Sequence, residues 1–164
     1  MRVIRDRPRS VDLDEFLSRP LFAHLATATD DGPRDSPVWF LWEEGALWIL
    51  GSRRTDSFPT RLESEPRCAL GIVDFDLTTG LVQHVGFRGR ASIEKLDRER
   101  GKRLLARYLG RDEAQWDARF RESLGDPDTV FVRFEPETAV ARDVSYLTQP
   151  GRGRRRAAVR RERA

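Results

Sequence analysis

The hydrophobic pattern along the chain is typical of short strands joined by tight turns. Runs that are apolar, β-branched or alternating, bounded by turn sequences, cover residues 21–29, 36–42, 46–51, 67–75, 81–93 and 130–134, with an extension of the last run to 141 left open. The sequences 30–33 (DDGP) and 43–45 (EEG) are turn signals, and two strands joined by so short a turn are antiparallel neighbours. The pattern predicts six strands, mostly linked as hairpins.

Helical periods interrupt this pattern at four places. A short amphipathic helix is predicted over 11–17, ended by Pro20, and another begins near residue 56 and ends before Pro66. Two more are predicted late in the chain, over 101–110 and, from a capping-box pattern, over 112–125. Mostly hairpin-linked strands with inserted helices predict a fold that is mainly β with helices (α+β), a six-stranded antiparallel barrel.

Length and composition fit one intracellular domain. The 164 residues suffice for a single core, and one cysteine excludes a disulfide framework and a clustered thiolate metal site. The first ten residues lack the apolar core of a signal peptide, and no apolar run approaches the roughly 18–20 residues that span a bilayer. We therefore expect a cytoplasmic protein that does not enter a membrane.

The excess of positive charge belongs to the end of the chain. Residues 150–164 hold seven arginines and one acid, a net charge of +6, so residues 1–149 carry −3 of the total of +3. The sequence thus predicts a domain over 1–147 and a disordered Arg-rich tail over 148–164. The basic pI of 9.6 is no argument that the domain binds nucleic acid. The tail alone is a candidate for weak, salt-sensitive binding to phosphates, the alternative being a solvated tail.

The residues that could carry chemistry are few. Phosphate-loop, dinucleotide-loop, paired-cysteine and zinc-protease motifs are all missing, and His24 and His84 are the two histidines. One segment, 51–61 (GSRRTDSFPTR), leaves a strand, combines three arginines with four hydroxyls and enters a helix. Guanidinium forks, hydroxyls and free backbone N–H groups are what a phosphate dianion requires. An ordinary solvated loop is the alternative interpretation.

The order of motifs resembles the pyridoxamine 5′-phosphate oxidase-like family, over about residues 16–146. The resemblance is carried by Leu25-Ala26-Thr27, Asp31-Gly32, Ser36-Pro37-Val38-Trp39-Phe40, Leu47-Trp48-Ile49, the Arg/Ser/Thr loop, Leu62 and Pro66-Arg67-Cys68-Ala69-Leu70. That family is a flavin-binding split β-barrel. The resemblance implies a homodimer with FMN at the subunit interface and a small-molecule substrate.

Carried over position by position, the resemblance also implies a cofactor site. Residues 36–40 would lie along the flavin ring, the phosphate group would be held within 52–57 with Arg61 as a further candidate, and His84 would replace a flavin-contacting glutamine. The loop is about two residues longer than in the oxidase proper and has no lysine. The implied cofactor-binding residues are Ser36, Pro37, Val38, Trp39, Ser52, Arg53, Arg54, Thr55, Ser57, Arg61 and His84.

The function that follows is an FMN-dependent oxidoreductase of unknown substrate, with no catalytic side chain identified. The C-terminal Arg-Leu-x-Pro region of the oxidase proper is absent, since the chain reads Arg142-Asp143-Val144-Ser145-Tyr146, so vitamin B6 oxidation is not supported. Two alternatives stay open. The cofactor could be a deazaflavin with a longer anionic tail, or the domain could bind flavin or haem without turnover, with His84 or His24 as a haem ligand.

Overall fold

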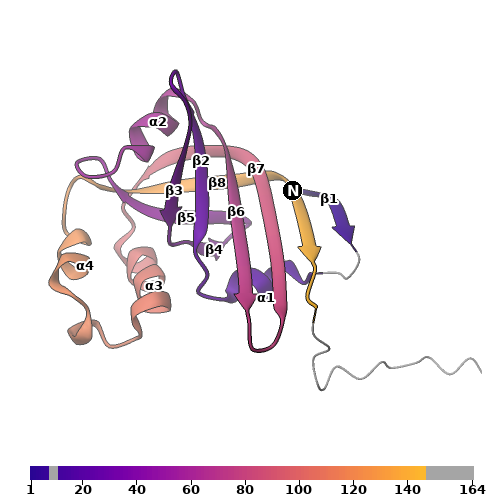
Figure 1. The fold of residues 1–164 in the computed structure, drawn as a ribbon. Helices are drawn as coiled ribbons and strands as arrows, with labels where there is room; N and C mark the ends of the chain where they lie inside the picture. Colours follow the sequence, from indigo (N-terminus) through magenta and orange to yellow (C-terminus); the bar gives the residue numbers. More distant parts are fainter. Residues whose placement is uncertain (8–10, 147–164) are drawn as a thin grey trace, which may run out of the picture.

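One twisted sheet, curved into an open split barrel, makes up most of the described residues (Figure 1). The structure is a computed structural model that describes residues 1–7 and 11–146. Within these residues the sheet has eight strands: seven follow the order β3-β2-β6-β7-β8-β5-β4, and β1 pairs with β8. The strands are β1 (Arg2–Arg7), β2 (Ala23–Thr29), β3 (Gly32–Val38), β4 (Leu41–Glu43), β5 (Ala46–Ser52), β6 (Arg67–Asp76), β7 (Leu81–Lys95) and β8 (Thr129–Asp143).

The mainly β class with added helices is confirmed, but the count of six strands is corrected to eight. β1 is charged and lacks the apolar alternation of a half-buried strand, and it forms by parallel pairing with β8. The strand predicted over 36–42 is divided: β3 pairs with β2, whereas β4 pairs with β5. The break falls at Trp39 and Phe40, because the Phe40 N–H is bonded to the Tyr108 hydroxyl at 3.1 Å. The extension of the last strand to 141, which the sequence left open, is confirmed, and the strand ends at Asp143.

In the part of the chain that the structure describes, four α-helices lie in the connections between strands. They are α1 (Leu13–Ser18), α2 (Phe58–Ser64), α3 (Arg98–Leu109) and α4 (Ala118–Ser123). The helix predicted over 112–125 is wrong as a single element: a 3₁₀ turn over Glu113–Gln115 precedes α4, and the chain is extended at Trp116. Two separate aspartate caps explain the division, since Asp112 accepts from the N–H of Ala114 and Asp117 from that of Arg119.

Two apolar cores hold the described helices and strands together. The main core fills the barrel, where Phe16 of α1, Leu25, Phe87 and Phe134 are fully buried. A second core lies where α3 and α4 cover β5 and β8, at the side of the barrel away from β1 (Figure 1). Trp116 belongs to this second core, with 3% of its surface exposed.

The outer face of β2, β6 and β7 is left without helices. Small residues line the middle of this face. Ala26 of β2 is opposite Ala69 of β6, and Gly71 of β6 is opposite Gly86 of β7. No helix in the described part of the chain has the length and apolarity needed to cross a membrane. The Arg-rich tail and its predicted nucleic-acid binding lie outside the described residues.

Candidate functional site

Arg61 is the centre of a polar cluster at one end of the barrel. Its Nε donates to the Thr27 hydroxyl at 2.7 Å, one Nη to the Ser57 hydroxyl at 2.5 Å and the other Nη to the Ser36 hydroxyl at 3.1 Å. The three hydroxyls come from β2, α2 and β3. We call these four residues the Arg61 cradle.

The Arg61 cradle carries a charge that no neighbouring acid neutralises. Within residues 1–7 and 11–146, Arg61 has no carboxylate at ion-pair distance, and its partners are neutral hydroxyls. Thr27 is only 3% exposed. A guanidinium held by neutral groups keeps its full attraction for an anion, and hydroxyls can turn to donate to phosphate oxygens. The cluster is therefore suited to a phosphate group.

The other two arginines of the loop are bonded elsewhere. Arg53 forms an ion pair with Glu63 at 2.5 Å, and Glu63 is two residues after Arg61, on the opposite side of α2. Arg54 pairs with Asp126 at 2.7 Å. Their predicted role at the phosphate group stays a prediction, but the structure does not bring them to Arg61.

The rest of the loop folds around its own acid. The Ser52 N–H donates to the Asp56 carboxylate at 2.8 Å, and the Ser52 hydroxyl accepts from the Arg54 N–H at 3.3 Å. Thr55 is exposed at the tip of the turn. Of the five loop residues predicted to bind cofactor, only Ser57 reaches the cradle.

A hollow of about 580 Å³ lies on the outer face, and Thr27 is among its lining residues. Because side chains alternate along β2, the buried Thr27 side chain and the cradle lie on the opposite face of this strand from Ala26 and Ala28. Ala26, Ala28 and Ala69 give it a flat floor, and Arg67 and Arg88 stand along it. Small side chains leave the backbone open to a flat ligand, and the hollow falls in the usual range for small-molecule sites.

His84 lies on the same outer face, further along β7. A Cβ on Gly86 would be 3.3 Å from its ring, so the imidazole covers that glycine. Burial, and then the charge of Arg142, lowers the pKa of His84 below 6.5. The ring is consequently neutral at pH 7 and can accept or donate a hydrogen bond. His24, the other histidine considered as a haem ligand, is exposed and bonded to Asp35 at 2.9 Å.

The strand predicted to follow the flavin ring ends in an aromatic stack. Pro37 is exposed on the outer face, whereas the Val38 side chain is buried in the main core. Trp39 is sandwiched between Tyr108, at a centroid distance of 4.6 Å, and Phe120, at 5.3 Å. The Trp39 ring is thus already stacked on this protein's own side chains, and a role for Val38 would use its backbone.

Two residues at the cradle were missed as site residues. Thr27 holds the Arg61 Nε, and Arg34 stands opposite Thr27 in the β2–β3 ladder, two residues from Ser36 on the same face of β3. The tight turn at 30–33 was a sufficient signal, because an antiparallel pair closed there places residues 27 and 34 opposite each other. Alternation along the strand then places Arg34 with Ser36.

The sheet order and the helix after β5 define an α+β split barrel of the pyridoxamine 5′-phosphate oxidase type. The family model described as pyridoxamine 5′-phosphate oxidase matches residues 12–142, and the chain belongs to this family. A comparison with curated proteins gives no match.

Solved structures with the same fold have diverse names. A conserved hypothetical protein, Rv2991 from Mycobacterium tuberculosis, is 19% identical with a TM-score of 0.65, covering 87% of this chain and 89% of that one. An F420 reductase is 24% identical with a TM-score of 0.61, and the match covers 80% of this chain and 97% of that one. The haem storage protein HutZ from Vibrio cholerae is 21% identical with a TM-score of 0.57, covering 82% and 92%.

Proposed function

We propose that the protein binds FMN and acts as an oxidoreductase on a small molecule. The observation that carries the proposal is the Arg61 guanidinium, which is held by three hydroxyls and by no acid among the described residues. An open, flat-floored hollow lies on the other face of β2. Membership in the oxidase family supports a flavin as the phosphate-bearing ligand.

In this proposal the Arg61 cradle holds the phosphate group. Arg61 supplies the charge, and the hydroxyls of Ser36 and Ser57 donate once they are released from Arg61. The backbone of 36–39 and the neutral His84 ring are the groups offered to the flavin ring. The bound cofactor supplies hydride transfer at its ring, so the chain needs to bind, orient and exclude water rather than to provide an acid or base.

A titration with FMN, followed by quenching of flavin fluorescence, tests the proposal. We expect Arg61→Gln to weaken FMN binding about 10–100-fold, the range for losing one hydrogen-bonded charge. Riboflavin has no phosphate and serves as the matched ligand, so its affinity should be the same in both proteins. Failure of the native protein to bind FMN would overturn the proposal.

The loop arginines provide the control variants. Because Arg53 and Arg54 are paired with Glu63 and Asp126, Arg53→Gln and Arg54→Gln should change FMN affinity by less than about threefold, well below a full charged hydrogen bond. A loss of FMN affinity in the Arg53 or Arg54 variant as large as that in Arg61→Gln would indicate that the loop binds the phosphate group, as the family resemblance implied.

A deazaflavin is the second candidate cofactor. Arg67 and Arg88 stand along the hollow on the outer face, where a longer anionic tail could meet them, and one structure of similar fold is an F420 reductase. A single deazaflavin absorption band on the bound protein would select this candidate. A haem band lost in His84→Ala would instead select the non-catalytic haem-binding alternative.

We also propose that the protein is a homodimer that joins the outer faces of two sheets. Val73, Phe75 and Leu77 along β6 and the adjoining turn are 52%, 59% and 72% exposed, next to the floor of small residues. Soluble monomers rarely leave such a patch open. Pairing two such faces would cover this patch and enclose the hollow on the outer face.

A further inference from the structure

His84 stands within the face that we propose joins two copies of the chain. In the sheet it is opposite Val73 of β6 on one side and opposite Arg142 of β8 on the other. Val73 and Phe75, which follow one another on this face of β6, are 52% and 59% exposed. A second copy that covers this apolar patch would therefore cover the imidazole ring as well.

The charges that face His84 on this side of the sheet are positive. The Arg142 side chain is exposed and forms no ion pair with any residue that the structure describes. Further along β7, Arg88 is on the same face, is exposed and is likewise unpaired within residues 1–7 and 11–146. Glu137 of β8 lines the hollow with Arg88 and is away from the position opposite His84.

The acids of the neighbouring strands do not offset this charge. Asp74 of β6 is paired with Arg19. Asp143 of β8 accepts from the Gln83 amide at 3.1 Å. Both carboxylates lie on the side of the sheet away from His84, because side chains alternate along each strand. A protonated imidazole at this position would thus have no carboxylate from its own strand or from the two strands that pair with it.

The other histidine on the outer face has a different environment. His24 of β2 is bonded through its Nδ1 to the Asp35 carboxylate at 2.9 Å. It therefore has the acidic partner that His84 lacks, which makes the two histidines a matched pair for experiment.

Pairing of two copies changes how well His84 binds a proton. Burial, and then the charge of Arg142, already lowers the pKa of His84 below 6.5 in a single copy. A second copy would remove more water from the ring and lower this pKa further. The separated copies would then bind the proton better than the dimer, so the dimer would be weakened as the pH falls through the lowered pKa.

We propose that acidification separates the two copies, because a protonated His84 would be enclosed between an apolar patch and an unpaired arginine. Each dimer contains two such histidines, so protonation acts twice on one interface. This inference rests on the proposed homodimer and adds its regulation, but it does not depend on the identity of the cofactor.

Light scattering of the full chain over a dilution series, with no cofactor added, gives the dissociation constant of the dimer. We expect this constant to rise about tenfold or more between about pH 7.5 and pH 5.5, as for a pKa lower by about one unit at each of two histidines. A dimer with the same constant at both pH values would overturn this inference alone. A tighter dimer at the lower pH would also overturn it, because a carboxylate of the second copy would then pair with His84. A chain that is monomeric at both pH values would overturn the proposed homodimer itself.

His84→Gln tests whether this side chain is responsible. Glutamine is a neutral hydrogen-bonding side chain, so the variant should dimerise within about threefold of the native protein at about pH 7.5 and lose most of the weakening at the lower pH. His24→Gln is the control and should weaken as the native protein does. If the His84→Gln dimer weakened as much as the native dimer, another group would be responsible and the inference would be wrong.

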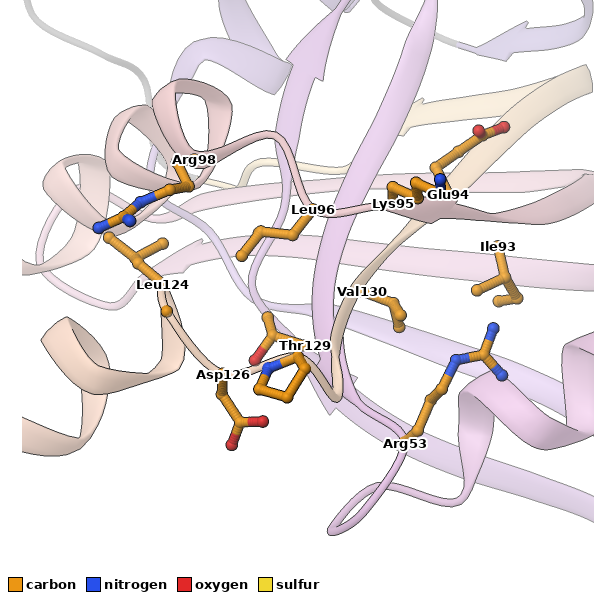
Figure 2. Close-up of a pocket in the computed structure, with 12 residues that line it drawn as sticks. Arg53, Ile93, Glu94, Lys95, Leu96, Arg98, Leu124, Asp126, Thr129 and Val130 are labelled. Carbon is orange, nitrogen blue, oxygen red and sulfur yellow. The ribbon is translucent and has the colours of Figure 1, made fainter.

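Arg142→Gln tests the charge beside His84. Without that charge the dimer should weaken less at the lower pH, whereas Arg98→Gln should leave the weakening native. Arg98 is also exposed and unpaired among the described residues, but Figure 2 shows it at the start of α3, beside a second hollow of about 540 Å³ that neither His84 nor Arg142 lines. Equal effects of the two substitutions would show that the net charge of the chain controls the dimer, and would overturn the inference.

Discussion

At the residue scale, the Tyr108 hydroxyl holds the break between β3 and β4. It accepts from the Phe40 N–H at 3.1 Å and lies 2.8 Å from the Leu21 carbonyl, to which it donates. Burial raises the pKa of Tyr108, so the hydroxyl stays protonated at neutral pH. The Tyr108 hydroxyl thus fixes the point where the chain leaves the sheet at the end of β3, the strand proposed to contact the flavin ring.

Tyr108→Phe tests this role. Removing the hydroxyl leaves a part-buried N–H and carbonyl without their partner, whereas the ring can keep its stacking on Trp39, so we expect a loss of about 1–3 kcal/mol. Urea unfolding followed by circular dichroism measures it, with Tyr146→Phe at an exposed tyrosine as the matched control. Equal stability of the two variants would show that the hydroxyl does not hold the break.

His84 gives a prediction for the pH dependence of stability. Because burial and Arg142 lower its pKa below 6.5, the folded state binds the proton less well than the unfolded state. The stabilisation from a neutral His84 is complete above pH 6.5 and is lost as the pH falls through the lowered pKa. His84→Gln should therefore reduce the loss of unfolding free energy between about pH 7.5 and pH 5. Urea unfolding at several pH values measures this, and an unchanged loss in the variant would refute it.

Three of the four cradle residues could be predicted from the sequence. Ser36, Ser57 and Arg61 could be proposed because their residue types and a resemblance pointed to phosphate. The ion pairs of Arg53 and Arg54 could not be predicted from the sequence. Glu63 reaches Arg53 from a helix, and Asp126 is 72 residues from Arg54. Charge composition identifies a basic loop, but only the fold decides which of its arginines remain unpaired.

At the element scale, the long strand β7 depends on one glycine. The β7–β8 register shifts between Arg88 and Gly89, and a Cβ on Gly89 would lie 2.0 Å from the Glu135 carbonyl oxygen. The backbones of β7 and β8 therefore approach too closely there for any side chain. This contact lies at the hollow on the outer face, because Gly89 and Arg88 both line it.

Gly89→Ala should accordingly be strongly destabilising. The methyl group meets backbone rather than a flexible side chain, so the strands must separate, at a cost of about 2–4 kcal/mol. Gly125→Ala is the matched control, because its nearest neighbour would be 3.7 Å away and its cost should be within about 0.5 kcal/mol. The midpoint of urea unfolding compares the two. A Gly89→Ala protein as stable as the control would mean that the strands separate freely.

Most elements could be predicted from the local sequence pattern. The elements that were not predicted mostly depend on distant partners. The hairpins and α3 have turn sequences, caps and apolar periods of their own. β1 depends on β8, which begins more than 120 residues later, and the β3–β4 break depends on Tyr108 in α3. The division of the predicted 112–125 helix was local, and the second cap at Asp117 signalled it.

At the scale of the whole molecule, the bare outer face decides how the site is completed. The barrel interior and the α3–α4 side are covered by packed cores, whereas Val73, Phe75 and Leu77 face solvent. A cofactor bound at the cradle and the hollow would lie open on this face in a monomer. A second copy placed against it would exclude water from the flavin and from the reacting substrate, which gives the proposed dimer a chemical purpose.

The dimer proposal is tested by reversing the apolar character of that face. Val73 and Phe75 alternate with the buried Ile72 on β6, so Val73→Glu combined with Phe75→Glu changes the outer face and leaves the core intact. Light scattering at micromolar concentration should give twice the chain mass of 18.9 kDa for the native protein and the single mass for the variant. Glu substitutions at the equally exposed Arg111 and Arg119 should keep the dimer. A native monomer would contradict the proposal. If the monomeric Val73→Glu/Phe75→Glu variant still bound FMN with native affinity, the protomer alone would hold the cofactor, and the partner subunit would serve only to shield it.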